Sequence, residues 1–197
     1  MKLKQNLNYS QPTFYKFNED SITLVKYVQK NFKFFENINV LDLCSGCGVI
    51  GLELLYYADV RFKLDLMEKQ IEFKVYLNSN KLLLKNNIDD IKIIISDFSS
   101  ESQRKSSSYD LIVCNPPYFE AGRSRLSANI NRNICRHFID NTYTDLIKAI
   151  SKLLKLSGTA YIITRQLLEE ENKLKLQIVK IKIKRNLYIY IIKHASS

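Results

Sequence analysis

The stretch Val40–Leu52, VLDLCSGCGVIGL, constrains the fold of this 197-residue chain more than any other. Its apolar start predicts a short buried strand, Asn39–Leu43, which turns sharply into a helix. Gly46, Gly48 and Gly51 allow that turn, let a ligand lie against bare backbone, and permit close packing of the helix on the strand. The stretch therefore predicts an α/β sheet with a ligand site at the carboxyl end of this strand.

An acidic residue ahead of the glycines indicates which ligand is bound. A GxGxxG pattern alone also occurs in folds that bind dinucleotide phosphates. Asp42, four residues before Gly46, would repel a pyrophosphate, whereas it can attract the positively charged amino and sulfonium groups of S-adenosylmethionine. The candidate cofactor contacts in this turn are therefore Asp42, Cys44, Gly46 and Gly48.

The ends of the next two predicted strands carry further cofactor candidates. The alternating run Phe62–Met67 ends in Glu68, whose carboxylate could accept both hydroxyls of a ribose, although it could also be an ordinary exposed glutamate. The apolar run Ile91–Ile95 is followed by Asp97 and Phe98. Asp97 could accept the amino group of an adenine while Phe98 packs on the ring. The alternative role for Asp97 is that of a loop cap.

A fourth predicted strand, Tyr109–Cys114, leads directly into Asn115, Pro116, Pro117 and Tyr118. The prolines fix the backbone, so the Pro116 carbonyl and the Asn115 side chain can form a rigid pair of acceptors. Such a pair can hold the hydrogens of a planar nitrogen, on adenine or on a glutamine amide, and turn its lone pair toward a sulfonium methyl. Asn115 is also a candidate cofactor contact, and Tyr118 would stack on the target plane. A turn without a catalytic role is the alternative.

Other elements are expected from apolar spacing and breaker residues. The sequence predicts a helix that starts at Asp20 or Ser21, and a polar surface loop over residues 99–108. Further expected elements are helices over residues 49–57, 71–84, 140–156 (stopped near Ser157 and Gly158) and 166–174, a strand over 159–164, and an antiparallel hairpin of Leu176–Ile183 with Leu187–Ile192.

The charge is strongly basic, with 30 lysines and arginines against 20 acids and a formal net charge of +10. This favours a polyanionic partner, although a lysine-rich proteome also yields basic proteins without such a partner. Four arginines with few acids follow the NPPY stretch: Arg123, Arg125, Arg132 and Arg136. Together with Phe119 they suit an RNA backbone beside the target, and solvated arginines on a linker are the alternative. Lysines in the C-terminal hairpin could equally contact RNA or protect a sheet edge.

Several classes of protein are not expected. Cys44 and Cys47 form a CxxC, but His137 and His194 lack ligand spacing to them, so these cysteines are expected to be small fillers and no metal is expected. No apolar run approaches the roughly 20 residues of a membrane span, and no leader pattern is seen. We expect a cytoplasmic, monomeric protein with one domain over residues 1–197.

The order and spacing of these motifs resemble those of the Rossmann-like class I S-adenosylmethionine methyltransferases that carry NPPY. This resemblance implies a seven-stranded, mostly parallel sheet with an antiparallel C-terminal hairpin and helices on both faces. It also implies that residues 1–36 form a helical extension near the cofactor. In that extension FNEDS matches the family's cofactor-side segment, which adds Asp20 to the cofactor contacts.

Within that group, NPPYFEAG followed by RNICRHF, Arg132–Phe138, resembles the bacterial tRNA1(Val) (adenine37-N6)-methyltransferases. Cys135 and Phe138 depart from the alanine and glutamate of that family's ARHE-type segment. The resemblance implies methylation of an adenine N6 in tRNA, whose anticodon-loop bases need only be unstacked.

Four alternatives are kept. Methylation of a release-factor glutamine is the main rival, although that family carries a helical domain ahead of the glycine turn and this chain has only a short segment there. Methylation of rRNA adenine or guanine is possible. DNA adenine methylation is disfavoured because no target-recognition domain is present. An inactive nucleic-acid-binding protein would not need all of Asp42, Glu68 and NPPY.

Overall fold

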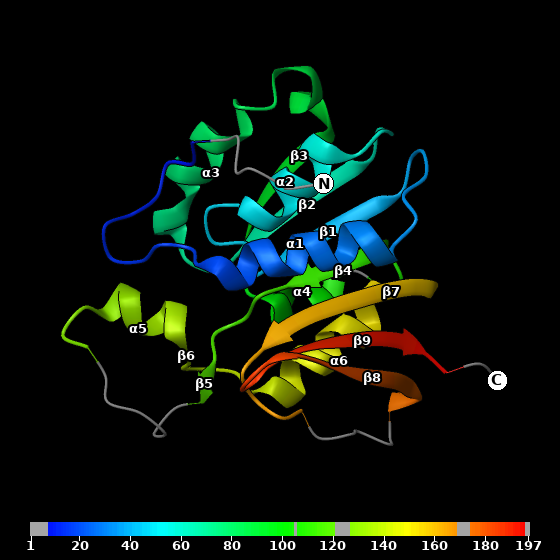
Figure 1. Ribbon diagram of the computed structural model, residues 1–197. Helices are drawn as coiled ribbons and strands as arrows, with labels where there is room; N and C mark the ends of the chain where they lie inside the picture. Colours follow the sequence, from blue (N-terminus) through cyan, green and yellow to red (C-terminus); the bar gives the residue numbers. More distant parts are fainter. Residues whose placement is uncertain (1–7, 105, 121–126, 169–173, 196–197) are drawn as a thin grey trace.

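The computed structural model describes residues 8–104, 106–120, 127–168 and 174–195. A twisted seven-stranded sheet forms its centre (Figure 1). In sheet order the strands are β3 (Ile91–Ile95), β2 (Lys63–Glu68), β1 (Asn39–Leu43), β4 (Tyr109–Cys114), β7 (Leu154–Thr164), β9 (Leu187–His194) and β8 (Leu176–Lys184). The first five are parallel to one another, and β9 is antiparallel to both β7 and β8. The predicted fold class and C-terminal hairpin are confirmed.

The strand order reverses between β1 and β4, because the chain runs outward from β1 to β3 and then returns to the other side. Leu43 of β1 lies in register with Cys114 of β4. The residues that follow these two strands, Cys44 and Asn115, therefore emerge next to each other. Ligands of open α/β sheets bind at this kind of switch point, beyond the carboxyl ends of the strands.

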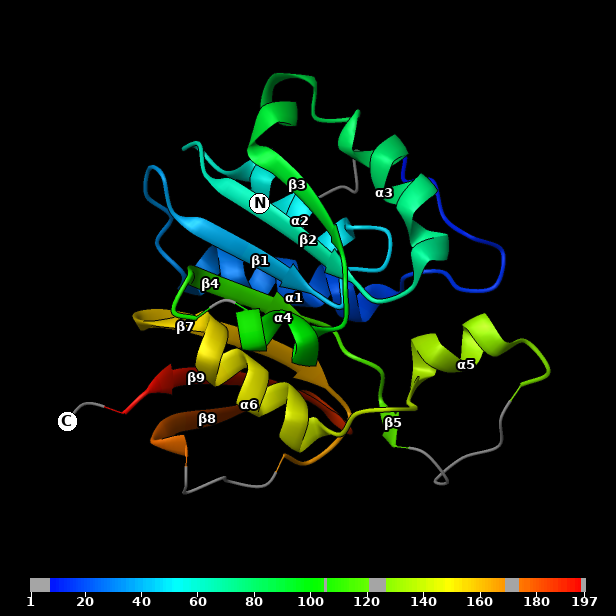
Figure 2. The ribbon, with the colours of Figure 1, turned by 180° about the vertical axis from the view of Figure 1, so that it is seen from behind.

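Helices cover both faces of the sheet, as Figures 1 and 2 show from opposite sides. One core contains α1 (Glu19–Asn31), α2 (Val49–Tyr57) and α3 (Lys74–Lys81), and the other contains α4 (Phe98–Arg104) and α6 (Tyr143–Leu153). Alternation along β1 divides its side chains between the two cores: Val40 joins the first, whereas Leu41 and Leu43 join the second. Two 3₁₀ turns, η1 (Ile71–Phe73) and η2 (Lys85–Asp90), flank α3.

Helix α1 begins two or three residues earlier than the sequence predicts, because Asn18 and not Asp20 or Ser21 is its N-cap. The Asn18 side chain accepts the backbone N–H of Asp20. Asp20 and Ser21 consequently lie in the first turn, where both side chains are buried. From there they contact the segment that follows β4: Ser21 accepts from Asn115, and Asp20 accepts from Tyr118.

The expected surface loop over residues 99–108 is wrong for its first half, because Phe98–Arg104 forms α4. Asp97 caps this helix: its Oδ1 accepts both the backbone N–H and the hydroxyl of Ser99 at 2.9 and 2.6 Å. Glu101 and Ser102 are buried although they are polar. Tertiary packing against α6 therefore creates a helix that the polar sequence does not signal.

The helix expected to continue to Ser157 and Gly158 instead ends at Leu153, and β7 follows at once. Gly158 lies inside that strand, where the register with β4 shifts. A Cβ atom added there would lie 2.9 Å from the Tyr109 carbonyl oxygen. A glycine is needed here because the two backbones approach closely at a bulge. The prediction that Gly158 ends a helix was wrong.

Two smaller differences concern other expected helices. The helix expected over residues 71–84 is shorter, since η1 precedes α3 and α3 ends at Lys81. Of the helix expected over residues 166–174, the part at Gln166–Leu168 is not helical, and residues 169–173 lie outside the described residues.

The described parts of the segment between β4 and α6 are folded where the sequence suggested a linker. They contain α5 (Ile130–Arg136) and a small parallel sheet of β5 (Phe119–Glu120) with β6 (His137–Phe138). Arg132 and Arg136 therefore lie on a helix, while Arg123 and Arg125 fall outside the described residues. This unit sits beside the carboxyl ends of β1 and β4 (Figure 2).

Candidate active site

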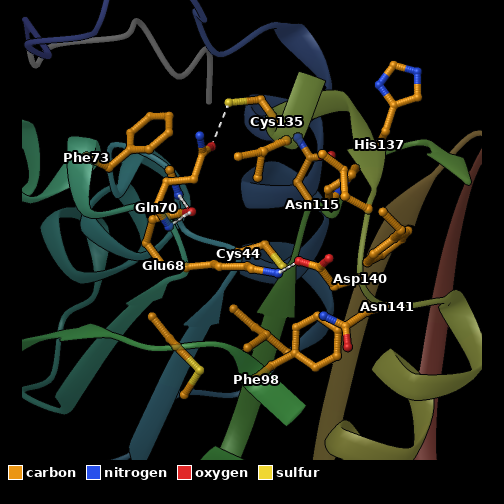
Figure 3. A pocket seen from close by; sticks show the side chains of 18 of the residues that line it. Cys44, Glu68, Gln70, Phe73, Phe98, Asn115, Cys135, His137, Asp140 and Asn141 are labelled. Atoms are coloured by element: carbon orange, nitrogen blue, oxygen red, sulfur yellow. Dashed lines mark hydrogen bonds and ion pairs between the residues drawn. The ribbon is translucent and has the colours of Figure 1, made fainter. Parts of the chain in front are cut away.

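A cavity lies at the carboxyl ends of β1, β2, β3 and β4, over the switch point (Figure 3). Its wall contains five of the predicted cofactor contacts: Cys44, Gly46, Glu68, Phe98 and Asn115. These residues follow or end four different strands, so the parallel register of the sheet brings them together. The five residues therefore line one cavity, as their positions at strand ends predict, and their contacts with a cofactor stay predictions.

Glu68 is held by backbone donors on the cavity wall. Its Oε2 accepts the Gly46 N–H at 2.8 Å and its Oε1 accepts the Gln70 N–H at 2.9 Å. Burial raises the pKa of this carboxyl, and the backbone donors oppose that rise by favouring the anion. Each oxygen keeps a further lone pair, so the carboxylate can accept a pair of ribose hydroxyls without moving.

Of the first two glycines in the turn, Gly46 lines the cavity and Gly48 does not. Gly46 has a φ of +55°, and a Cβ added there would meet a single atom within 4 Å, of Phe73 at 3.7 Å. Gly48 has a φ of +82° and faces the core, where a Cβ would lie 3.1 Å from both Leu66 and Leu77. Gly46 can therefore lie against a ligand, whereas Gly48 shapes the turn from outside the cavity lining.

Asp42 lies beneath this turn and outside the cavity lining. Its Oδ2 accepts the Gly51 N–H at 2.8 Å, and its Oδ1 has no hydrogen-bond partner within the described part of the chain. Burial raises the pKa of this carboxyl to about 7. An unpaired buried acceptor is costly, so this oxygen is suited to a cationic group or a water held by the bound ligand.

The raised pKa of Asp42 predicts a specific pH dependence of stability. Between pH 4 and pH 7 the folded chain retains a proton that the unfolded chain has lost, so stability without ligand falls as pH rises, by up to about 4 kcal/mol. Urea unfolding of the wild type and of Asp42→Asn at pH 5 and pH 8 measures this. The stability difference between the two proteins should change with pH in that direction, and a constant difference would contradict the assigned pKa.

Asp97 also lies outside the cavity lining, and both of its oxygens are engaged. Oδ1 caps α4, whereas Oδ2 accepts from Asn141 at 2.9 Å and pairs with Lys69 at 3.1 Å. Burial alone would raise the pKa of Asp97, but hydrogen bonds from Ser99 and Lys69 hold it below its ordinary value. The members of this network that line the cavity are Lys69, Asp140 and Asn141.

The residues after β4 are fixed by partners from across the fold. The Asn115 Nδ2 donates to the Ser21 hydroxyl at 3.0 Å, which leaves its Oδ1 as the acceptor of that side chain. The Pro117 carbonyl accepts the Tyr143 hydroxyl at 2.9 Å, and the Tyr118 carbonyl accepts the Gln166 amide at 2.8 Å. The NPPY segment is therefore rigid, as its prolines predict.

Asp20 lies behind Tyr118 and away from the cavity that holds Glu68. It is 1% exposed, accepts the Tyr118 hydroxyl at 3.0 Å, and pairs with Arg165 at 2.7 Å. Lys184 approaches its second oxygen at 3.6 Å, and the Arg165 guanidinium lies 5.5 Å from the centre of the Tyr118 ring. This geometry makes Asp20 a residue that positions Tyr118.

A second cavity adjoins the first on the side of NPPY. Its lining includes Pro116, Tyr118 and Phe119. Tyr15 and Cys135 line both cavities, and so form the junction between them. Its volume of about 240 Å³ far exceeds the roughly 10–15 Å³ that admits a single water, so a planar group can enter. Asn115 lines the first cavity and Pro116 lines the second, so these two consecutive residues lie where the cavities adjoin.

The family model of the methyltransferase small domain matches residues 15–192, nearly the whole described chain. The chain belongs to this methyltransferase family. The resemblance drawn from the glycine turn and NPPY is thereby confirmed at the level of the family.

Curated relatives of this methyltransferase carry two kinds of name. The tRNA1(Val) (adenine(37)-N6)-methyltransferase of Histophilus somni strain 2336 is 31% identical over 137 residues, which cover 64% of this chain and 54% of that protein. The release factor glutamine methyltransferase of Clostridium botulinum is 31% identical over 100 residues, 50% of this chain and 34% of that protein. The chain therefore spans about half the length of the tRNA1(Val) methyltransferase relative and about a third of the release factor methyltransferase relative.

Solved structures share the fold at low identity. A ribosomal protein L11 methylase of Lactobacillus delbrueckii matches with a TM-score of 0.60 at 15% identity, over 92% of this chain and 81% of that one. A precorrin-6y C5,15-methyltransferase of Geobacter metallireducens matches with a TM-score of 0.58 at 11% identity, over 95% and 94%. Their names refer to substrates as different as a protein and a macrocycle, so the fold alone does not indicate the target.

The cofactor of this methyltransferase is S-adenosylmethionine, and the described residues fit it. Glu68 offers two fixed acceptors for a ribose, and Gly46 leaves room beside them. Phe98 and Phe138 lie 6.5 Å apart in an edge-to-face pair and form an apolar wall suited to an adenine ring. The orphan Oδ1 of Asp42 lies beneath the turn.

The sequence prediction missed several wall residues of the methyltransferase site. Tyr15 comes from an irregular segment, and Cys135 from a helix that was expected to be a linker. Phe138, which stands where the resembling family has an acid, is 5% exposed and packs 4.9 Å from Tyr143. Apolar periodicity could have indicated none of them, because Tyr15 lies in an irregular N-terminal segment, and Cys135 and Phe138 are placed by the fold of the segment after NPPY.

Neither metal nor membrane features are found in the parts that the structure describes. Residues 8–104, 106–120, 127–168 and 174–195 hold no group of three or more His, Cys, Asp or Glu side chains arranged to bind a metal ion. Within the same ranges, no helix has the length and apolar character that a bilayer crossing demands.

Proposed function

We propose that this methyltransferase transfers the methyl group of S-adenosylmethionine to the N6 atom of an adenine in tRNA, with adenine 37 of tRNA1(Val) as its target. The names of relatives at about 30% identity support this substrate. The observation that carries the proposal is the position of Asn115 and Pro116 between the two cavities. A planar amine that enters the second cavity meets both acceptors at the mouth of the first.

The chemistry assigned to the chain is orientation. Bound S-adenosylmethionine supplies an electrophilic methyl group. The Asn115 Oδ1 and the Pro116 carbonyl accept the two N6 hydrogens and turn the nitrogen lone pair toward the first cavity, while Tyr118 stacks on the base. As the bond from nitrogen to the methyl forms and the methyl–sulfur bond breaks, the nitrogen becomes acidic, so it can release one proton to water and no strong base is required. Alignment of this kind can contribute roughly 7–11 kcal/mol to lowering a barrier.

Ser21 is proposed to position Asn115 in this reaction. Its buried hydroxyl accepts the Asn115 Nδ2, which keeps Oδ1 directed at the target. Ser21→Ala should lower kcat about tenfold with unchanged cofactor Kd and RNA KM, and Ser21→Thr should restore it. Thr23→Ala, on the exposed side of the same helix, is the matched control.

A double-mutant cycle separates this role from general stabilisation. If Ser21 acts through Asn115, Ser21→Ala should add no further loss of turnover to an Asn115→Ala enzyme. An additive loss would show that Ser21 acts independently of the amide, and would remove the positioning role.

The deciding test of the function is a labelled methyl transfer to unmodified total tRNA, to rRNA and to a purified release factor, followed by digestion. We expect N6-methyladenosine from tRNA, with the label at position 37 when tRNA1(Val) is used alone. Label confined to rRNA, or to the protein, would overturn the proposed substrate.

Glutamine N5-methylation of a release factor is the second candidate, and the Clostridium botulinum relative favours it. A glutamine amide is planar, carries two hydrogens on its nitrogen, and fits the same pair of acceptors. Label recovered as methylglutamine would select this function. It would leave the roles of Asn115, Pro116 and Tyr118 unchanged.

A further inference from the structure

We infer that a basic groove beside the target cavity, the α5 groove, binds the phosphates of the RNA strand that flanks the target adenine. This inference rests on the proposed function and assigns a surface to it. The α5 groove is formed by residues 13–16 of the N-terminal segment and by Arg132 and Arg136 of α5. These elements lie on either side of a surface cavity of about 330 Å³.

The α5 groove is continuous with the second cavity. Tyr15 and Arg136 line both of them, so a strand whose base stacks on Tyr118 can pass directly between the N-terminal segment and α5. Arg136 stands at this passage, and its guanidinium lies 5.8 Å from the centre of the Phe119 ring. The groove is therefore placed where the nucleotide next to the target has to lie.

The charge of the groove is of one sign. Lys16, Arg132 and Arg136 are all exposed, and no acidic residue is among the described residues that line either cavity. Arg132 and Arg136 are four residues apart on α5 and so project from the same face. Like charges this close repel, and an external anion would relieve that repulsion.

Several cations elsewhere on the surface of the described chain have a carboxylate partner. Arg61 and Lys63 both pair with Asp90, and Lys155 pairs with Asp110. Arg165, at the other end of the second cavity, is already balanced by Asp20. In the described ranges, by contrast, none of Lys16, Arg132 and Arg136 forms an ion pair with a carboxylate.

Phosphate is the anion that fits best. The planar guanidinium of arginine forms paired hydrogen bonds with phosphate oxygens, and successive phosphates of a strand match a row of cations. A peptide bearing a target glutamine has no such repeated charge. The α5 groove thus favours a nucleic acid over a protein as the occupant of the second cavity.

The edge strand β8 offers a matched control surface. Lys180 and Lys182 are exposed on it, and lysines on an edge strand also serve to prevent sheet-to-sheet association. Lys180→Ala with Lys182→Ala therefore removes the same charge as Arg132→Ala with Arg136→Ala, but away from the groove.

The experiment measures the Kd of tRNA for the wild type and both double variants between 50 and 200 mM salt. Loss of the two groove arginines should weaken binding about tenfold or more and reduce the slope of log Kd against log salt by about 1.5. The cofactor Kd should be unchanged. Arg132→Lys with Arg136→Lys should keep most of the slope, and the β8 variant should keep all of it.

The possible results separate the inference from the proposed function. If the wild type methylates tRNA but the groove variant binds it with an unchanged slope, the groove assignment is wrong and the function stands. A slope lost only in the β8 variant would transfer the RNA surface to that edge. If the wild type methylates only the release factor and does not bind tRNA, the proposed function fails and the groove assignment fails with it.

Discussion

Replacing Asn115 with alanine should lower kcat at least ~100-fold while the S-adenosylmethionine Kd stays within a few-fold. Asn115 lines the cofactor cavity, but its Nδ2 donates to Ser21, and its remaining acceptor, Oδ1, is the atom assigned to the target nitrogen. Loss of a single pre-organised polar contact to a reacting group costs roughly 100- to 1,000-fold in comparable sites. Single-turnover methylation with cofactor already bound measures this step directly.

Asn115→Asp is the matched control, because aspartate keeps an acceptor at the same place. It should retain far more activity than Asn115→Ala. Normal single-turnover chemistry together with a large loss of cofactor affinity in Asn115→Ala would contradict the role given to this residue, and would make it a cofactor contact.

Glu68→Ala should weaken S-adenosylmethionine binding by ~100-fold or more. Two hydrogen bonds to a charged carboxylate are lost, and the backbone N–H groups of Gly46 and Gln70 lose their acceptor as well. Calorimetric titration of the purified protein measures the Kd, and kcat at saturating cofactor should stay close to that of the wild type. Glu68→Gln, which keeps one acceptor oxygen, should lie between the two. An unchanged Kd in Glu68→Ala would remove Glu68 from the cofactor site.

The strand-end residues of the site could be predicted because their causes are local. A buried strand followed by glycines, or by two prolines, fixes where the backbone turns, and parallel strands place their carboxyl ends together. The closeness of Glu68 and Asn115 at one edge of the sheet follows from the parallel register, and their contacts with ligands stay predictions. The fold of the central sheet was predictable for the same reason, since its strands are short apolar runs separated by clear breaks.

The unpredicted parts depend on contacts between distant segments. Helix α4 forms from a polar sequence because Asp97 caps it and α6 covers it. Gly158 is required by the Tyr109 carbonyl, which no local pattern reveals. Asp20 was assigned to the cofactor by resemblance, and the structure places it against Tyr118. Its assignment as a direct cofactor contact stays a prediction that this geometry does not support.

The local sequence pattern predicts the substrate less well than it predicts the fold. Asn115 and Pro116 can hold any planar nitrogen with two hydrogens, so the motif alone does not distinguish adenine from glutamine. The distinguishing surface lies in the folded segment after NPPY, where Arg136 joins the second cavity to the α5 groove. That segment has weak periodicity, which is why its arginines were taken to lie on a linker.

The contacts of Asp20 form between segments that are synthesised at different times. One carboxylate joins Tyr118 to Arg165 and Lys184, so residues that are far apart in the sequence meet at Asp20. During translation the glycine turn and NPPY leave the ribosome long before β8 does. A nascent chain that stops short of β8 carries both motifs but lacks part of the clasp around Asp20. The set of contacts around Asp20 can therefore be complete only after β8 has been synthesised.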